Sequence, residues 1–134
     1  MQQRIVFDTN IYLSALIFGG NSRRVLEQSL QLGIGIIVSE EIFTEMRRVI
    51  SRKFPEVEQE YTAFEMFLRT QTVMVPLGSI QVDICRDSKD NHIFETAILG
   101  SCSYIVTGDK DILTLEEYQK IRTVTPAQFL AMFN

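Results

Sequence analysis

Two short apolar segments near opposite ends of the chain most constrain its fold. Residues 4–8 read RIVFD and residues 104–109 read YIVTGD, so each segment ends at an aspartate, Asp8 or Asp109. Both segments are rich in β-branched residues and lack apolar–polar alternation, which is typical of strands buried on both faces of a parallel sheet. Ligand crevices in such sheets lie at the carboxyl ends of the strands. We therefore expect Asp8 and Asp109 to share one sheet edge, where their repulsion favours a bound cation.

The rest of the chain alternates strand and helix patterns, which favours an α/β sandwich with a mostly parallel sheet. Further strands are expected at 35–38, 72–75 and 121–124. Helices are expected at 9–17, 22–33, 39–55, 57–69, 88–101 and 112–115, and from Pro126 onwards, whereas 77–86 is interpreted as a loop. The chain has 134 residues and no repeat or linker, so we expect one domain, residues 1–134.

The amino-acid composition narrows the kind of protein that this chain can be. A hydrophobic content of 46% fits a folded globular chain. No apolar run is long enough to span a bilayer and no signal peptide is recognised, so a cytoplasmic protein is expected.

Cys85 and Cys102 lack a CxxC spacing and are expected to be reduced thiols. The formal charge of −4 disfavours nucleic-acid binding. However, bound cations would offset that charge, and basic residues gather at 23–24 and 47–53.

Two further acids fall on apolar helix faces. Glu45 is three residues after Ile42 and four before Val49, which places it on the same helical stripe. Asp90 is three residues before Ile93 and opens the apolar face of its helix. A carboxylate that faces inward is rarely buried without a partner. Both acids are therefore expected near the sheet edge rather than in solvent.

Asp8, Glu45, Asp90 and Asp109 are thus expected to converge, two from strand ends and two from helix faces. Oxygen ligands alone suit Mg²⁺ or Mn²⁺, whereas zinc usually brings His or Cys. His92 is the only histidine and is expected on the helix surface or in a half-buried gap. Divalent ions can activate water and stabilise the charge that develops during displacement at phosphorus. The four acids are therefore the candidate catalytic and metal-binding residues.

Each acid also has a purely structural explanation. Asp8 could cap the first helix, and Asp109 could be a turn residue. Glu45 could reach solvent or pair with Arg48, and Asp90 could be an N-terminal helix charge. The joint pattern is more specific than any single acid.

At these residues the chain resembles the PIN-domain family, including the VapC-type toxins of bacterial and archaeal toxin–antitoxin pairs. The resemblance covers essentially the whole chain and rests on VFDTN at 6–10, on Glu45, on residues 87–97 and on IVTGDKDIL at 105–113. It implies a three-layer α/β/α fold around a mostly parallel sheet of about five strands. It also implies a ribonuclease dependent on Mg²⁺ or Mn²⁺, often a homodimer and often held inactive by a small antitoxin protein.

The resemblance also assigns site residues. The family's acidic positions fall on Asp8, Glu45, Asp90 and Asp109. The third position is open, because Asp87 and Asn91 flank Asp90. Asp111 matches a further acidic position that is variably used. Polar groups that could hold the carboxylates or a water are those of Thr9, Asn10 and Thr107.

The sequence therefore predicts a metal-dependent endoribonuclease that hydrolyses RNA phosphodiester bonds, as the toxin component of a toxin–antitoxin pair. The enzyme alternative is a phosphatase of the haloacid dehalogenase type, which also places an aspartate at the end of its first strand. That chemistry needs a second aspartate two residues later, where this chain has Asn10. The non-enzyme alternative is a catalytically silent PIN-like binding module, which the presence of all four acids disfavours.

Overall fold

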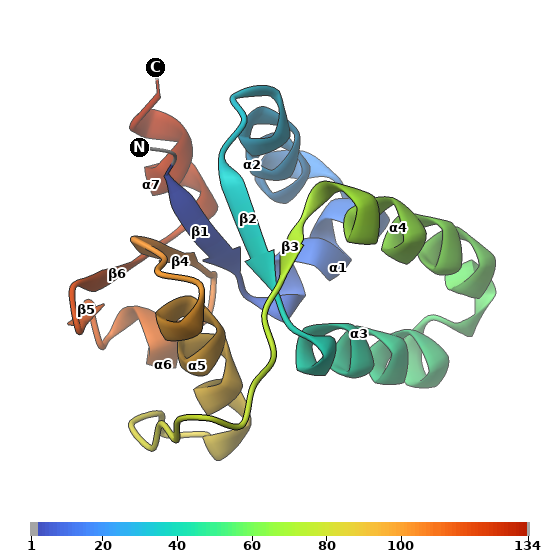
Figure 1. Ribbon diagram of the computed structural model, residues 1–134. Helices are drawn as coiled ribbons and strands as arrows, with labels where there is room; N and C mark the ends of the chain where they lie inside the picture. Colours follow the sequence, from blue (N-terminus) through green and yellow to red (C-terminus); the bar gives the residue numbers. More distant parts are fainter. Residues whose placement is uncertain (1–2, 134) are drawn as a thin grey trace.

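The computed structural model describes residues 3–133, in which six strands form one sheet in the order β3-β2-β1-β4-β6-β5 (Figure 1). The strands are β1 (Arg4–Phe7), β2 (Gly35–Val38), β3 (Val73–Met74), β4 (Tyr104–Val106), β5 (Glu117–Tyr118) and β6 (Ile121–Val124). β5 pairs antiparallel with β6, and the other pairs are parallel. The predicted mostly parallel α/β architecture is confirmed.

The strand count differs from the expected five because β5 adds a short hairpin strand. The turn between β5 and β6 uses two residues with positive φ, Gln119 and Lys120, and Glu116 directly before β5 has a third. Left-handed turn positions are usually signalled in a sequence by Gly or Asn. None of these three residues gives that signal, so the hairpin could not be recognised beforehand.

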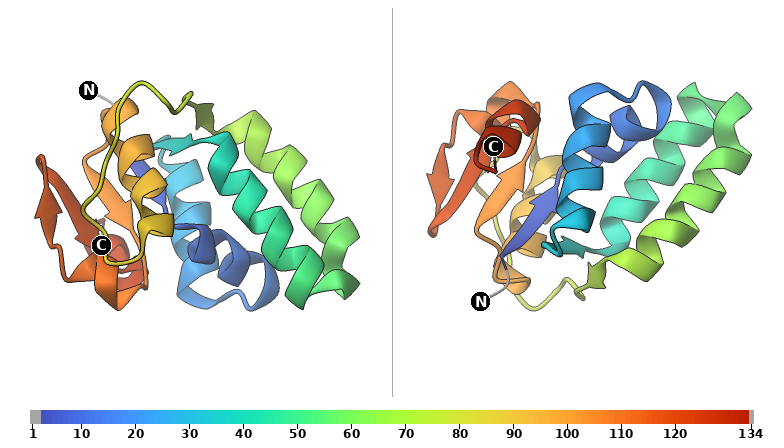
Figure 2. Two further views of the ribbon diagram at one scale, coloured as in Figure 1. Left: turned by 90° about the horizontal axis from the view of Figure 1, so that it is seen from below. Right: turned by 90° about the horizontal axis from the view of Figure 1, so that it is seen from above.

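The helices flank both faces of the sheet. They are α1 (Thr9–Ile17), α2 (Gly20–Gln31), α3 (Glu40–Lys53), α4 (Glu58–Gln71), α5 (Asn91–Leu99), α6 (Lys110–Leu113) and α7 (Pro126–Ala131), with 3₁₀ turns η1 (Pro55–Val57) and η2 (Ser88–Asp90). α2 packs on β2, α1 and α7, whereas α5 packs on β1, β2 and β4 from the opposite face (Figures 1 and 2). α3 and α4 lie side by side at one end of the molecule (Figure 2).

The core explains why the central strand lacks alternation. Ile5, Val6 and Phe7 are all completely buried, so β1 is covered on both faces. Burying each such side chain contributes about 1.5–3 kcal/mol. Parallel register with β4, including Phe7 opposite Val106, then brings the ends of the two strands to one edge. The buried core thereby fixes where Asp8 and the residues after β4 must lie.

Most helix predictions are confirmed, with shifts of one or two residues at several ends; α6, for example, is Lys110–Leu113 rather than 112–115. α2 begins at Gly20 rather than Ser22, after Gly19 turns the chain at a φ of +78° that glycine tolerates. The helix expected over 88–101 is divided into η2 and α5, and it ends at Leu99. Within residues 3–133, no helix combines the length and apolar character needed to cross a membrane. Both cysteines are free thiols, as expected, and burial raises the pKa of Cys85 to about 11.

Candidate active site

Asp8 stands directly after β1 and is 5% exposed. Its backbone N–H donates to the carbonyl oxygen of Val106 at 2.9 Å, which continues the pairing of β1 with β4 past the last strand residue. Its Oδ2 accepts a hydrogen bond from the buried hydroxyl of Thr107 at 2.8 Å. Desolvation raises the pKa of Asp8, and the charges of Glu45 and Asp109 raise it further, against the opposing Thr107 bond. No side-chain cap bond from Asp8 to α1 is formed in the described chain, so its structural explanation as a helix cap is not supported.

Asp109 follows β4 and lies on the same sheet edge. Its backbone N–H donates to Thr107 Oγ1 at 3.0 Å. Its Oδ1 accepts from the N–H of Asp111 at 2.8 Å and, at 3.4 Å, from that of Ile112, so it is also the N-cap of α6. The structural explanation of Asp109 as a turn residue is therefore confirmed, and it leaves the carboxylate at the sheet edge near Asp8. One carboxylate oxygen caps the short helix while the negative charge raises the pKa of Asp8.

Glu45 projects from the middle of α3 and is half-buried, with 28% of its side chain exposed. Its Oε1 lies 3.8 Å from Nε2 of His92, an ion-pair distance when the imidazole is protonated. Burial raises the pKa of Glu45, but His92, the Thr9 hydroxyl and Arg48 together outweigh that effect and lower it. Glu45 thus lies on the inner side of α3 as predicted.

Asp90 ends η2 and is partly buried. Burial and the charges of Asp8, Asp109, Asp87 and Glu45 raise the pKa of Asp90 to about 6. These charges include all three of the other candidate acids, so all three lie within electrostatic reach of Asp90. Repulsion of this kind is what a cation relieves.

The two rivals for the third acidic position have other partners. Asp87 caps η2 by accepting from the N–H of Lys89 at 3.0 Å. Asn91 accepts from the N–H groups of Ile84 at 3.2 Å and Cys85 at 3.0 Å, which fastens the preceding loop to α5. Both of these side chains hold backbone in place, whereas Asp90 makes no cap bond and its pKa is raised by the other acids.

The remaining predicted polar residues divide into those at the site and those outside it. Thr9 is 2% exposed, and its Oγ1 has no hydrogen-bond partner among the described residues, although it lies close enough to Glu45 to lower the pKa of that carboxyl. Asn10 is exposed. Asp111 is 48% exposed and its Oδ1 lies 3.5 Å from Nη1 of Arg86. Thr9 and Thr107 therefore belong to the acidic site, and Asn10 and Asp111 lie at its periphery.

Comparison with known proteins decides the family. The PIN domain profile matches residues 4–111, a span that includes all four candidate acids. The chain belongs to the PIN domain family. It is also 28% identical to the uncharacterised protein MJ1680 of Methanocaldococcus jannaschii, over 97% of this chain and 91% of that protein.

A solved structure agrees with the fold of this PIN domain. The chain is similar to a chain in the crystal structure of VapBC2 from Rickettsia felis bound to a DNA fragment from its promoter. The TM-score is 0.65, and the match covers 92% of this chain and 98% of that chain, at 15% sequence identity. At this identity the similarity supports the three-layer fold and not a shared activity.

His92 lies closer to Glu45 than the sequence indicates. Its side chain is 18% exposed and faces Glu45, and its Nδ1 is buried without a hydrogen-bond partner in the described chain. The expected half-buried position is confirmed, but its pairing with Glu45, 47 positions earlier in the sequence, joins α5 to α3. No local pattern in the sequence encodes such a pairing.

The side chains of this PIN domain do not enclose an ion by themselves. Within residues 3–133, no group of three or more His, Cys, Asp or Glu side chains is placed to hold a metal ion. Mg²⁺ usually retains several waters and takes only one or two carboxylates directly. A buried Asp8 beside three further acids and the hydroxyl groups of Thr9 and Thr107 offers oxygen donors of that kind, and the one imidazole, that of His92, pairs with Glu45. The residues present therefore fit a hydrated hard cation.

Proposed function

We propose that this protein is an endoribonuclease dependent on Mg²⁺ or Mn²⁺ that hydrolyses RNA phosphodiester bonds. The observation that carries the proposal is the burial of Asp8 at a sheet edge where Glu45, Asp90 and Asp109 act on one another electrostatically. A folded protein has little reason to keep four mutually repelling carboxylates together unless they serve a charged ligand. Membership of the PIN domain family supports a nuclease.

Asp8, Glu45, Asp90 and Asp109 would hold the cation. When bound, the cation would supply Lewis-acid stabilisation of the charge that develops on the phosphate, and a lowered pKa for coordinated water. Asp8 is held rigidly by Thr107, so its carboxylate keeps one orientation. Glu45 and Asp90, which come from helices, would orient the attacking water and accept its proton.

We also propose that the protein is the toxin of a toxin–antitoxin pair, a cytoplasmic homodimer inhibited by a small antitoxin protein. The structural neighbour is part of a VapBC2 assembly, which supports a partner of this kind. A short, overlapping reading frame for a DNA-binding protein beside the gene, and co-purification of its product with this chain, would test the pairing.

The alternatives fit the site less well. A phosphatase of the haloacid dehalogenase type would need an acid at position 10, where Asn10 is exposed. A silent binding module would not need Asp8 and Asp90 to lie where neighbouring carboxylates raise their pKa values. Membership of the PIN domain family also disfavours the phosphatase.

Cleavage of a labelled single-stranded RNA in manganese tests the activity directly. The parent protein should cut, and Asp8→Asn and Asp109→Asn should each lose at least about a hundredfold in rate, because each removes a charge from the site. Glu45→Gln should show a similar loss. Asp83→Asn, the same change at an exposed loop position, is the matched control and should retain full activity. Full activity in Asp8→Asn or Asp109→Asn would overturn the assignment.

A further inference from the structure

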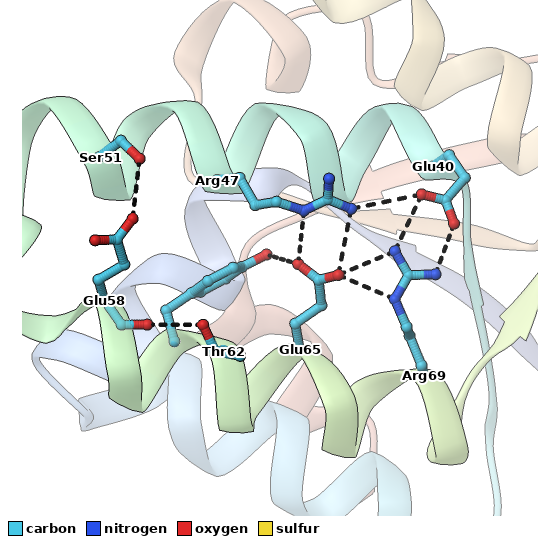
Figure 3. Close-up of polar contacts among 8 residues, drawn as sticks. Glu40, Arg47, Ser51, Glu58, Thr62, Glu65 and Arg69 are labelled. Carbon is cyan, nitrogen blue, oxygen red and sulfur yellow. Dashed lines mark hydrogen bonds and ion pairs between the residues drawn. The ribbon is translucent and has the colours of Figure 1, made fainter.

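Several basic side chains of this acidic protein are engaged in its own structure. Arg47 and Arg69 lie between Glu40 and Glu65, as Figure 3 shows. Arg69 binds Glu40 through two nitrogens, at 2.6 and 3.0 Å. The positive charge of an arginine paired in this way is largely neutralised by the carboxylates, so it attracts a phosphate only weakly. An RNA strand must therefore find its cations elsewhere.

Two further arginines are occupied by backbone groups. Arg4 donates to the carbonyl oxygen of Gly100 at 2.9 Å. Arg23 donates to the carbonyl oxygen of Ala15 at 3.0 Å. Both bonds tie helix ends to neighbouring elements, so these cations serve the fold.

Arg48 and Lys89 differ from these residues. Within the described part of the chain, neither the guanidinium of Arg48 nor the ammonium of Lys89 makes a hydrogen bond or a close ion pair. Arg48 comes from α3 and Lys89 from η2. They nevertheless line one cleft of about 430 Å³, together with Glu45 and His92. Two elements distant in sequence thus bring unpaired cations to the cleft that borders the acidic site.

The size and charge of this cleft suit a nucleotide phosphate. Small-ligand sites typically have volumes of about 300–1,000 Å³. Glu40 also lines the cleft, but its charge is balanced by Arg69. The unbalanced acids are Glu41 and Glu45, and a cation bound at Glu45 would leave the positive side chains in excess. Phosphate contacts by Lys and Arg position a strand without reading its sequence.

We propose that Arg48 and Lys89 form a phosphate-binding subsite that holds a phosphate next to the scissile one on a single-stranded RNA. The subsite rests on the proposed nuclease function and places the RNA strand across the cleft between α3 and η2. Arg48 and Lys89 are positioning residues that bind the strand and take no part in bond breaking. Removing them should weaken RNA binding and leave the chemical step unchanged.

The experiment uses Arg48→Ala, Lys89→Ala and the double variant, with the double variant Arg52→Ala/Lys53→Ala as the matched control. Arg52 and Lys53 are exposed residues of the same helix and lie outside the cleft lining. With a short labelled RNA, the double cleft variant should raise KM about 3- to 10-fold, the effect expected of two partly exposed charge contacts. Its kcat should stay within about twofold, and the control should match the parent.

Binding without cleavage gives a second measurement. In the Asp8→Asn background, the logarithm of RNA affinity should fall less steeply with the logarithm of the salt concentration in the cleft variants. The slope should become shallower by about 0.7 for each cation removed, as expected for a single strand. Arg48→Lys and Lys89→Arg keep the positive charge and should retain most of the parent's affinity for RNA. A dinucleotide has only the scissile phosphate, so its KM should not respond to the cleft variants.

The outcomes separate the two proposals. Cleavage by the parent with no difference between the cleft and control variants would overturn the subsite and leave the nuclease standing. Weaker RNA binding in the cleft variants of a protein that cuts no RNA would support phosphate binding by Arg48 and Lys89, but it would overturn the nuclease and the placement of this phosphate next to a scissile one. Equal loss of affinity in both double variants, or a dinucleotide KM that rises with the cleft variants, would also overturn the subsite.

Discussion

Thr107 donates a hydrogen bond from its hydroxyl to Oδ2 of Asp8 at 2.8 Å, and both residues are buried. The same oxygen of Thr107 accepts from the N–H of Asp109 at 3.0 Å. One side chain therefore fixes the carboxylate that ends β1 and the backbone that follows β4. The two acids are held at one edge by a single hydroxyl group.

Thr107→Val should disable this arrangement while keeping the shape of the side chain. The variant leaves Asp8 and one backbone N–H without their partner, which typically costs about 1–3 kcal/mol in the free energy of unfolding. RNA cleavage should fall more than tenfold, because the Asp8 carboxylate loses its fixed orientation. Denaturant unfolding and a cleavage assay measure both effects. Thr107→Ser keeps the hydroxyl and should behave as the parent; equal activity of the Val and Ser variants would contradict this role.

Metal-free stability should depend on pH through Asp90. Its pKa is raised from an ordinary value of 3.8 to about 6, so the folded state binds more protons than the unfolded state between these values. Stability should therefore fall as pH rises through this window. In chelator, Asp90→Asn should be as stable as the parent near pH 4 and more stable above pH 6, by up to about 1 kcal/mol after allowance for solvent screening. Urea unfolding across this range measures the difference, and a constant difference would contradict the electrostatic account.

The strand ends could be predicted because they follow from burial. A run such as Ile5–Phe7 has no polar face, so it must be a central strand, and parallel neighbours must end at one edge. The inward position of Glu45 followed in the same way from helical periodicity. These features depend on local sequence and on one general rule about sheets.

The contacts that complete the site depend instead on tertiary packing. Ser39 is a residue type that favours the N-cap of a helix, yet in the described chain its side chain makes no cap bond to α3 and accepts from Thr96 Oγ1 at 3.0 Å. The pairing of His92 with Glu45 likewise joins two helices that only the folded sheet brings together. Secondary-structure propensity and residue spacing depend on neighbours along the chain, so they do not predict partners from distant elements.

Mg²⁺ or Mn²⁺ should stabilise the parent against heat. Binding to the folded state alone contributes about 2.7 kcal/mol at a hundredfold excess of metal over Kd. A thermal scan in millimolar metal should therefore show a higher Tm than a scan in chelator. Asp8→Asn should lose most of this response but should not be less stable than the parent in chelator, because a repelling charge is gone. An unchanged Tm of the parent in metal would remove the support for a cation site.

The ion-pair network between α3 and α4 should stabilise the fold independently of the active site. Burial alone would raise the pKa of Glu65, but hydrogen bonds from Arg47, Tyr61 and Arg69 outweigh it and lower the pKa. This stability is present at neutral pH and is lost as pH falls through the folded-state pKa. Glu65→Gln should lower the free energy of unfolding by about 1–3 kcal/mol at pH 7.

Glu58→Gln is the control for this network, because Glu58 is exposed and its Oε1 accepts only a long bond of 3.4 Å from Ser51. Its effect on urea unfolding should be under about 0.5 kcal/mol. Cleavage activity per folded molecule should be unchanged in both variants. A loss of activity in Glu65→Gln without a loss of stability would show that α4 takes part in the reaction.

The ends of the cut RNA should distinguish hydrolysis from attack by the substrate's own 2′-hydroxyl. Attack by that hydroxyl usually needs a general base and a general acid, for which imidazoles are best suited. This chain has one histidine, and His92 already faces Glu45. A cluster of carboxylates with a cation is better suited to direct water in line with the departing 3′-oxygen. Products should then carry 5′-phosphate and 3′-hydroxyl ends, and a 2′-deoxy sugar at the cut position should still be cleaved. Mapping the termini of an end-labelled RNA measures this, and cyclic 2′,3′-phosphates that disappear in Asp8→Asn would assign the reaction to this site but by the other mechanism.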